Sequence, residues 1–229
     1  MVGIYDSGSG GEEALAFFRK MRPNTEVAFL ADRKNAPYGE KSEDELIPVI
    51  EAAIGRLLSA GCDKILIACC TASTLHGALC EKKRKCSIPI IEPTADEAVR
   101  VSKTGRIAVI STEVTKRSGA FVTAIKERSS EAEVISLACP GLVRLADGGY
   151  SDGNLDKYGL SVIKEELASL KREKFDTLVL GCTHFSRFKN TAEELLGARA
   201  VNSAFIGAET LAKETIPSQM RGGTIYLEP

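Results

Sequence analysis

The sequence predicts an α/β protein with parallel sheets, built from two similar halves. Strand-like runs alternate with amphipathic helix-like runs from one end of the chain to the other, a pattern typical of parallel sheets covered by helices. An Asp, a hydrophobic run and a Cys recur with the same spacing at Asp63–Cys69 and Asp176–Cys182. The pattern restarts near Pro93, and Arg106–Thr112 then repeats the opening Val2–Ser7 as a strand ending in small polar residues. These repeats indicate an internal duplication.

The expected strands follow the buried-strand pattern of short apolar, β-branched runs. In chain order they are Val2–Tyr5, Glu26–Ala31, Lys64–Ala68, Pro89–Ile91, Arg106–Ile110, Glu133–Leu137, Thr177–Leu180, the weaker Ala200–Val201, and a last edge strand at Thr224–Leu227. We place the first lobe at residues 1–92 and the second at 93–206, and we expect the tail at 207–229 to return to the first lobe.

The expected helices show apolar residues three and four positions apart. A first helix carries Leu15, Phe18 and Met21. Ser42–Glu45 has the form of a capping box that opens a second helix. That helix bears Leu46, Ile50, Ile54 and Leu57, with Pro48 early in it as a potential bend. A further covering helix bears Leu160, Ile163, Leu167 and Leu170.

Composition excludes several classes of function. The net charge is −1 with acidic and basic residues mixed throughout, so the chain lacks the basic footprint of a nucleic-acid binder, and we expect a small-molecule ligand. It has neither the roughly 18 consecutive apolar residues of a spanning helix nor a basic leader, so we expect a soluble, cytoplasmic protein with no membrane partner. A homodimer is common for such folds, but no residue pattern specifies an interface.

The seven cysteines form an odd set without a secretory signal, so we expect reduced thiols rather than a disulfide framework. Metal binding is not expected, since no C-x-x-C pair occurs and only His76, Cys80 and Cys86 offer even an imagined ligand set. We interpret Cys80 and Cys86, together with Cys62 and Cys139, as buried structural thiols, and we place His76 on a helix surface.

Cys69 and Cys182 differ from the other thiols because each directly follows an expected strand. The carboxyl edge of an open α/β sheet is where ligands bind, and two such edges would present two thiols to one small molecule from opposite sides. Each Cys precedes an expected helix start, whose partial positive charge lowers a thiol's pKa from about 8.5. His184, two residues after Cys182, can assist proton transfer or stabilise a thiolate.

The glycine-rich segment Asp6–Gly11 lies between the first strand and the first helix. Its spacing fits neither a Walker loop nor a dinucleotide fingerprint, so nucleotide binding is disfavoured. Two interpretations remain open: backbone donors at the helix start that hold a carboxylate, and a tight turn in which Asp6 and Ser7 act as caps.

Four ordered motifs together give a more specific indication than any one of them. Asp6-Ser7-Gly8, Ala36–Ser42, Ala68–Ser73 and Gly181–Phe185 resemble the successive motifs of the glutamate racemases, which belong to the cofactor-independent aspartate/glutamate racemase superfamily. The resemblance runs over nearly the whole chain. It implies two doubly wound α/β lobes related by pseudo-twofold symmetry, with the substrate and active site between them, and no pyridoxal phosphate or other cofactor.

The resemblance also implies residue roles and a reaction. Cys69 and Cys182 would be the two bases that deprotonate and reprotonate the α-carbon of glutamate, assisted by Asp6 and His184 respectively, and the product D-glutamate would supply peptidoglycan synthesis. The expected substrate-binding residues are Ser7, Tyr38, Gly39, Cys70, Thr71, Thr112, Thr115 and Thr183.

The chain departs from the family's pattern at several positions. Cys70 stands where Asn is usual, and it lacks the amide donors and acceptor of Asn. Asp147, the acid that would orient His184, is one methylene shorter than the usual Glu. Asn202-Ser203 stands where Asp-Ser is common, and Ser9 replaces an apolar residue. These departures keep two alternatives open: a racemase of altered preference, for example for aspartate, and a weakly catalytic amino-acid-binding protein on the racemase fold. A redox switch between Cys69 and Cys70 is disfavoured, because a vicinal disulfide strains the peptide between them.

Overall fold

The computed structural model describes residues 1–215 and 222–228, so residues 216–221 and 229 of the expected tail lie outside the described residues. The chain divides into two compact units, Met1–Ile90 with Ala204–Pro229 (unit 1) and Ile91–Ser203 (unit 2). Each unit is an α/β fold with its own parallel sheet. Among the described residues, no helix has both the length and the apolar character needed to cross a bilayer.

Unit 1 contains a sheet of five parallel strands in the order β4-β3-β1-β2-β9. The expected edge strand is confirmed, since β9 pairs with β2 in parallel register. The elements of unit 1 are β1 (Val2–Asp6), α1 (Gly11–Met21), β2 (Val27–Ala31), η1 (Tyr38–Glu40), α2 (Glu43–Ser59), β3 (Lys64–Ile67), α3 (Cys70–Ser73), η2 (His76–Ala78), α4 (Glu81–Cys86), β4 (Ser87–Pro89), α11 (Ser203–Lys213) and β9 (Thr224–Leu227), where η denotes a 3₁₀ helix.

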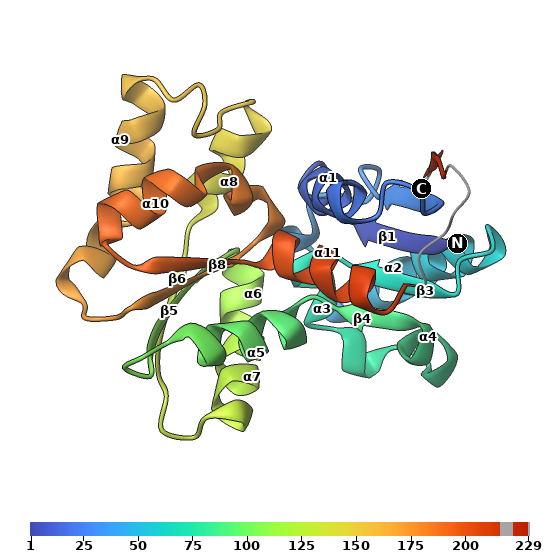
Figure 1. Cartoon of the computed structure of the whole chain (residues 1–229), viewed down its shortest axis with the longest axis horizontal. Helices are drawn as coiled ribbons and strands as arrows, with labels where there is room; N and C mark the ends of the chain where they lie inside the picture. The colour runs from blue at the N-terminus through green and yellow to red at the C-terminus, as the bar shows by residue number, and fades with distance from the viewer. Residues whose placement is uncertain (216–221, 229) are drawn as a thin grey trace. The chain divides into compact units, whose positions relative to one another are not determined.

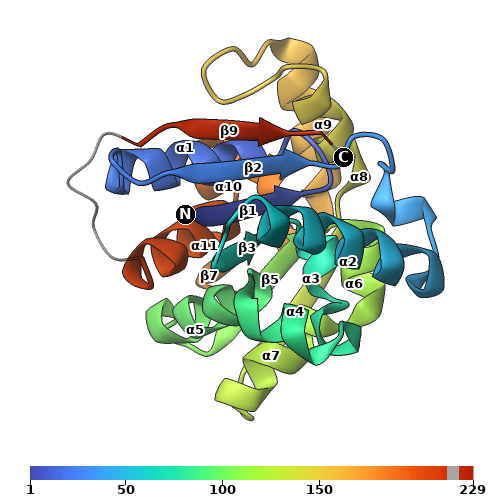
Figure 2. The same cartoon turned by 90° about the vertical axis from the view of Figure 1, so that its right-hand side faces the viewer.

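Helices cover both faces of the unit 1 sheet, so its central strands are buried on both sides. On one face, α2 packs its apolar stripe against alternate residues of β1, β2 and β3. The capping box that opens α2 is present, because Ser42 accepts from the backbone of Glu45 while the Glu45 carboxylate accepts from the backbone of Ser42. On the other face, α1 lies against Phe29 and α11 against Leu66. Figure 2 shows α1 and α2 on opposite faces of this sheet.

Unit 2 contains a sheet of four parallel strands in the order β6-β5-β7-β8. Helices α8, α9 and α10 bury one face of this sheet, and α5 and α7 lie on the other (Figure 1). The unit consists of α5 (Ile91–Val101), β5 (Arg106–Ser111), α6 (Glu113–Ser118), α7 (Ala120–Arg128), β6 (Glu133–Ala138), α8 (Pro140–Asp147), α9 (Lys157–Glu166), η3 (Ala168–Arg172), β7 (Thr177–Gly181), η4 (Thr183–Phe188), α10 (Lys189–Leu196) and β8 (Arg199–Asn202).

Two predicted elements differ in the structure. The strand expected at Pro89–Ile91 is β4 at Ser87–Pro89, and Ile91 instead begins α5. The β-branched pair Ile90-Ile91 resembles a strand, but the Pro two residues later is compatible with a first helical turn. The helix expected through Leu170 ends earlier, since α9 stops at Glu166 and Leu170 lies in the tighter η3.

Expectations about three single residues were also wrong. His76 begins the 3₁₀ turn η2 rather than lying on a helix surface, and its Nε2 is 3.1 Å from the Ser87 hydroxyl. Cys62 and Cys139 are buried as expected, but Cys80 is exposed and Cys86 is only partly buried. Both belong to the short, charged segment around α4, which buries none of its residues.

Candidate active site

Cys69 lies just beyond the end of β3, at the carboxyl edge of the unit 1 sheet, and begins α3 as its N-cap. Its Sγ accepts a hydrogen bond from the backbone N–H of Ala72 at 3.5 Å and lies 3.2 Å from the hydroxyl of Ser7. Only 6% of the residue is exposed. The structure therefore brings Ser7, from the loop after β1, to the Cys69 thiol, which is a candidate proton-transfer group.

Asp6 ends β1, the strand next to β3, and its carboxylate is buried. Oδ1 accepts from the backbone N–H of Gly8 at 2.8 Å, so Asp6 closes a tight turn. The N-cap of α1 is Gly10, with no side-chain cap, so the cap proposed for Asp6 and Ser7 serves this turn and not the helix. Gly11 is required here, since a Cβ on it would overlap the Cβ of Asp6.

The pKa of the Cys69 thiol is raised to about 11, first by burial and second by the negative charge of Asp6. Hydrogen bonds from Ser7 and from the Ala72 backbone oppose this shift without reversing it. The low pKa predicted from the helix start was therefore wrong for Cys69. The helix α3 has only four residues, so its dipole is small, and burial disfavours the charged thiolate.

Tyr38 is part of a buried polar network in unit 1. Its hydroxyl donates to Oδ2 of Asp32 at 2.7 Å and is also hydrogen-bonded to the Tyr5 hydroxyl. Asn35 Nδ2 contacts both oxygens of Asp32 at 2.9 Å. Burial, followed by Tyr5, raises the pKa of the Tyr38 phenol. The Tyr38 hydroxyl is already hydrogen-bonded within the protein, so the groups that the Tyr38-Gly39 segment can offer to a ligand are mainly its backbone donors and acceptors.

Asp32 and its partners Tyr5 and Asn35 were not identified from the sequence. A signal was present, because Asp32 directly follows the predicted strand Glu26–Ala31, as Asp6 and Cys69 follow theirs. The other two predicted binding residues of unit 1, Cys70 and Thr71, are buried in α3 immediately after Cys69.

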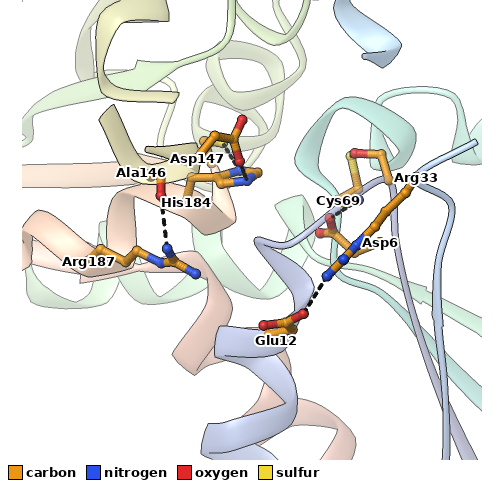
Figure 3. Close-up of polar contacts among 11 residues, drawn as sticks. Asp6, Glu12, Arg33, Cys69, Ala146, Asp147, His184 and Arg187 are labelled. Atoms are coloured by element: carbon orange, nitrogen blue, oxygen red, sulfur yellow. Dashed lines mark hydrogen bonds and ion pairs between the residues drawn. The ribbon is translucent and has the colours of Figure 1, made fainter. Parts of the chain in front are cut away.

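Cys182 directly follows β7 at the carboxyl edge of the unit 2 sheet and is the N-cap of η4, so the expected helix start is a 3₁₀ helix. Its Sγ lies 3.6 Å from Nδ1 of His184, and Nε2 of His184 lies 3.1 Å from Oδ1 of Asp147 (Figure 3). A carboxylate only accepts hydrogen bonds, so Nε2 carries the proton toward Asp147. In the neutral ring, Nδ1 then carries a lone pair, and this lone pair is directed at the Cys182 thiol.

The geometry of this second cluster suits a general base. The His184 side chain is 12% exposed and that of Asp147 is 57% exposed, so the imidazole is enclosed while the carboxylate keeps contact with water. A carboxylate partner stabilises the imidazolium that forms when the ring takes the thiol proton. The expected association of Asp147, His184 and Cys182 is therefore present as a three-group chain.

Gly181 directly precedes Cys182 in unit 2, and two predicted threonines follow the neighbouring strand. A Cβ on Gly181 would lie 2.8 Å from the Phe121 ring and 2.9 Å from the carbonyl of Ile110, so only glycine fits before the thiol. Thr112 caps α6 by accepting from Thr115 N–H at 3.2 Å, and its hydroxyl lies 2.9 Å from that of Thr115. Both follow β5, the neighbour of β7. The remaining predicted residue, Thr183, is buried in η4.

No three His, Cys, Asp or Glu side chains gather into a candidate metal site within 1–215 and 222–228. The two clusters instead combine a thiol with a carboxylate in unit 1, and a thiol with an imidazole and a carboxylate in unit 2. Thiols flanked by groups that can take or return a proton are the kind of site that suits an enzyme of proton transfer.

Comparison with known proteins agrees with this class. The model of the Asp/Glu/Hydantoin racemase family matches residues 19–211. A glutamate racemase of Desulforudis audaxviator is 38% identical over 87% of this chain and 72% of its own length. The chain belongs to the Asp/Glu/Hydantoin racemase family, a family of isomerases.

Solved structures show the same fold. The glutamate racemase isoform RacE1 of Bacillus anthracis superposes with a TM-score of 0.87 at 26% identity, covering 100% of this chain and 88% of that one. Glutamate racemase of Escherichia coli, solved with L-glutamate and the activator UDP-MurNAc-ala, gives a TM-score of 0.77 at 25% identity, with 99% and 88% coverage. The predicted α/β fold class is confirmed.

Proposed function

We propose that this protein is a glutamate racemase that interconverts L- and D-glutamate with Cys69 and Cys182 as its two acid–base groups. The observation that carries the proposal is that an interior strand of each sheet leads to a thiol with a titratable neighbour. The charge of Asp6 acts on Cys69, and Nδ1 of His184 lies 3.6 Å from Sγ of Cys182. The names of the family relatives support glutamate as the substrate.

The reaction requires one proton to leave the α-carbon and another to arrive on its opposite face. A thiolate takes the α-proton, so the C–H bond breaks and an S–H bond forms. The second thiol then gives its proton to the resulting carbanion. The roles exchange for the reverse reaction, and no electron leaves the system.

The two thiols start from different protonation states in this scheme. Burial and Asp6 hold Cys69 as a neutral thiol, which is ready to donate a proton, while the His184 lone pair can receive the proton of Cys182. Before Cys69 can act as a base, Asp6 must take its proton, and a bound substrate ammonium would favour the resulting thiolate by its positive charge.

The substrate's polar groups would be held by hydroxyls and backbone amides at the two sheet edges. We assign this role to Ser7, Tyr38, Gly39, Cys70 and Thr71 in unit 1 and to Thr112, Thr115 and Thr183 in unit 2. We also propose a cytoplasmic role in which the D-glutamate formed supplies peptidoglycan synthesis.

Turnover of an amino-acid panel tests the proposed substrate. The two enantiomers of glutamate, aspartate and alanine are incubated with the purified protein, and loss of optical rotation is followed. We expect the highest kcat/KM with glutamate. A higher value with aspartate would replace this proposal by a racemase of altered preference, which the Cys70 side chain favours.

The second candidate function is amino-acid binding with little catalysis, favoured by Cys70 and by the raised pKa of the Cys69 thiol. Calorimetry with L-glutamate, followed by α-deuterium uptake in heavy water, separates the two. A binding protein would hold glutamate without exchanging its α-proton, whereas a racemase exchanges it at every turnover.

A further inference from the structure

The Asp147 carboxylate poses a positioning problem. It is the last residue of α8, and its side chain is 57% exposed. Exposed ion pairs contribute little because water competes and side-chain entropy is lost. An Asp side chain is also short, so the position of its oxygens follows the backbone closely. The 3.1 Å contact with His184 therefore depends on what fixes the end of α8.

Arg187 contacts the chain on both sides of Asp147. Its Nη1 donates to the carbonyl of Ala146 at 3.0 Å (Figure 3), and its own carbonyl accepts from the backbone N–H of Asp152 at 2.7 Å. Arg187 and His184 both belong to η4. The same 3₁₀ helix that carries the imidazole thus holds the backbone that carries its carboxylate partner.

Asp152 lies in the loop that follows α8 and ties this loop to α10, the helix after η4. Its carboxylate accepts from the backbone N–H of Asn190 at 2.8 Å, from the backbone N–H of Thr191 at 3.2 Å and from the Thr191 hydroxyl at 2.6 Å. These donors lie in the first turn of α10, where a negative charge is favourable. Loop and helix are therefore tied by charge-assisted hydrogen bonds that do not involve Asp147 itself.

From these contacts we infer that Arg187 is a positioning residue for the Asp147–His184–Cys182 chain. It fixes the end of α8 against η4, so that the Asp147 carboxylate stays within hydrogen-bond distance of the His184 ring. A backbone shift of about 1 Å would lengthen that contact beyond hydrogen-bond range. The inference rests on the proposed function, in which Cys182 gives its proton to His184, but its test does not require turnover.

The test measures how fast iodoacetamide alkylates Cys182 in the substrate-free protein, with peptide mass spectrometry resolving each cysteine. Alkylation needs the thiolate, so its rate reports how well His184 takes the thiol proton. We expect Arg187→Gln to slow the alkylation of Cys182 by about tenfold, the change that one pKa unit would cause. Cys69, in unit 1, should keep its rate in the same sample and so reports intact folding.

Matched variants separate positioning from charge. Arg172→Gln removes the same charge from an exposed position on η3 of the same unit and should leave Cys182 unchanged. Arg187→Lys keeps a donor for the Ala146 carbonyl and should restore most of the rate. Asp147→Asn should slow the alkylation of Cys182 as much as Arg187→Gln does. The double variant should be alkylated no more slowly than either single variant, because both changes interrupt the same Asp147–His184–Cys182 series of contacts.

A second readout follows the imidazole directly. The chain has only two histidines, so His76→Asn leaves the His184 ring as the sole source of imidazole signals. In a His76→Asn background, Arg187→Gln should shift the Nε2 resonance of His184 as Asp147→Asn does. This measurement remains informative if access to Cys182 limits alkylation.

Two results would overturn the inference. One is unchanged Cys182 alkylation and an unchanged His184 spectrum in folded Arg187→Gln. The other is a double variant whose loss is the product of the two single losses, which would mean that Arg187 and Asp147 act independently. Absence of glutamate turnover with the predicted alkylation pattern intact would contradict the proposed function but not the positioning role of Arg187.

Discussion

Burial and, after it, the negative charge of the nearby Asp6 carboxylate hold the thiol of Cys69 in its protonated form by raising its pKa. Asp6 ends β1 and Cys69 follows the neighbouring strand β3, and the charge of Asp6 is the second cause of the raised pKa. The same carboxylate is the group we propose to receive the thiol proton during the reaction. Asp6 therefore opposes ionisation at rest and assists it during turnover.

This double role predicts opposite changes in two measurements on Asp6→Asn. Removing the charge lowers the pKa of Cys69, so its alkylation at pH 8 should rise by roughly three- to tenfold, equivalent to a half to one pKa unit. Racemisation should fall by about 10²-fold or more, the usual contribution of a general base. In wild type, with a Cys69 pKa of about 11, alkylation of Cys69 should climb about tenfold per pH unit from pH 8 to pH 10. A decrease in Cys69 alkylation in Asp6→Asn would contradict the electrostatic role.

Gly181→Ala should displace the second thiol. The added Cβ would lie 2.8 Å from the Phe121 ring and 2.9 Å from the Ile110 carbonyl, and such overpacking costs about 1–3 kcal/mol. We expect a matching loss of stability in urea unfolding and a larger loss of kcat, because Cys182 is the next residue. Gly77→Ala is the control, since no atom lies within 4 Å of its Cβ. Equal stabilities of the two variants would show that the β7 end adapts freely.

Cys70→Asn should improve recognition of glutamate. The thiol has one weak donor, whereas an amide offers two donors and an acceptor for the charged groups of an amino acid. We expect the KM for glutamate to fall by about tenfold, the value of roughly one hydrogen bond to a charged group. Kinetics with both enantiomers measure this change, and Cys80→Asn, at an exposed thiol, is the control. A KM that rises in Cys70→Asn would indicate a substrate smaller or less polar than glutamate.

Cys139 should make the fold sensitive to alkaline pH. Burial, and then the charge of Glu166, raises its pKa to about 12, whereas an unfolded thiol ionises near pH 8.5. The neutral thiol therefore contributes its full stability below about pH 8.5, and this contribution is lost as the pH rises toward 12. Urea unfolding under reducing conditions should show a steeper loss between pH 8 and pH 10 for wild type than for Cys139→Ala. Parallel losses would mean that Cys139 does not titrate on unfolding.

Much of the scaffold could be predicted because local patterns determine it. The short apolar runs gave the strands of both sheets, and the Ser42/Glu45 pair gave the start of α2. The sequence could not distinguish a strand from a helix at Ile90-Ile91, where periodicity over so few residues is ambiguous. It also suggested ordinary helices after both thiols, where the structure has a four-residue α3 and the 3₁₀ helix η4.

The candidate site was predictable in its residues but not in its electrostatics. Cys69 and Cys182 were found because each follows a strand, and His184 because it is close in sequence to Cys182. The raised pKa of Cys69 depends on burial by the folded chain, which no local pattern reports. Arg187 contacts Ala146, 41 positions away in sequence, so its contribution emerges only from the fold.

The most direct test of the two-thiol mechanism is racemisation of L-glutamate in heavy water by wild type, Cys69→Ser, Cys182→Ser and the exposed-site control Cys80→Ser. We predict that wild type and the control form D-glutamate carrying deuterium at the α-carbon, and that both active-site variants lose racemisation. D-glutamate formed at the wild-type rate by either Cys69→Ser or Cys182→Ser would contradict the mechanism.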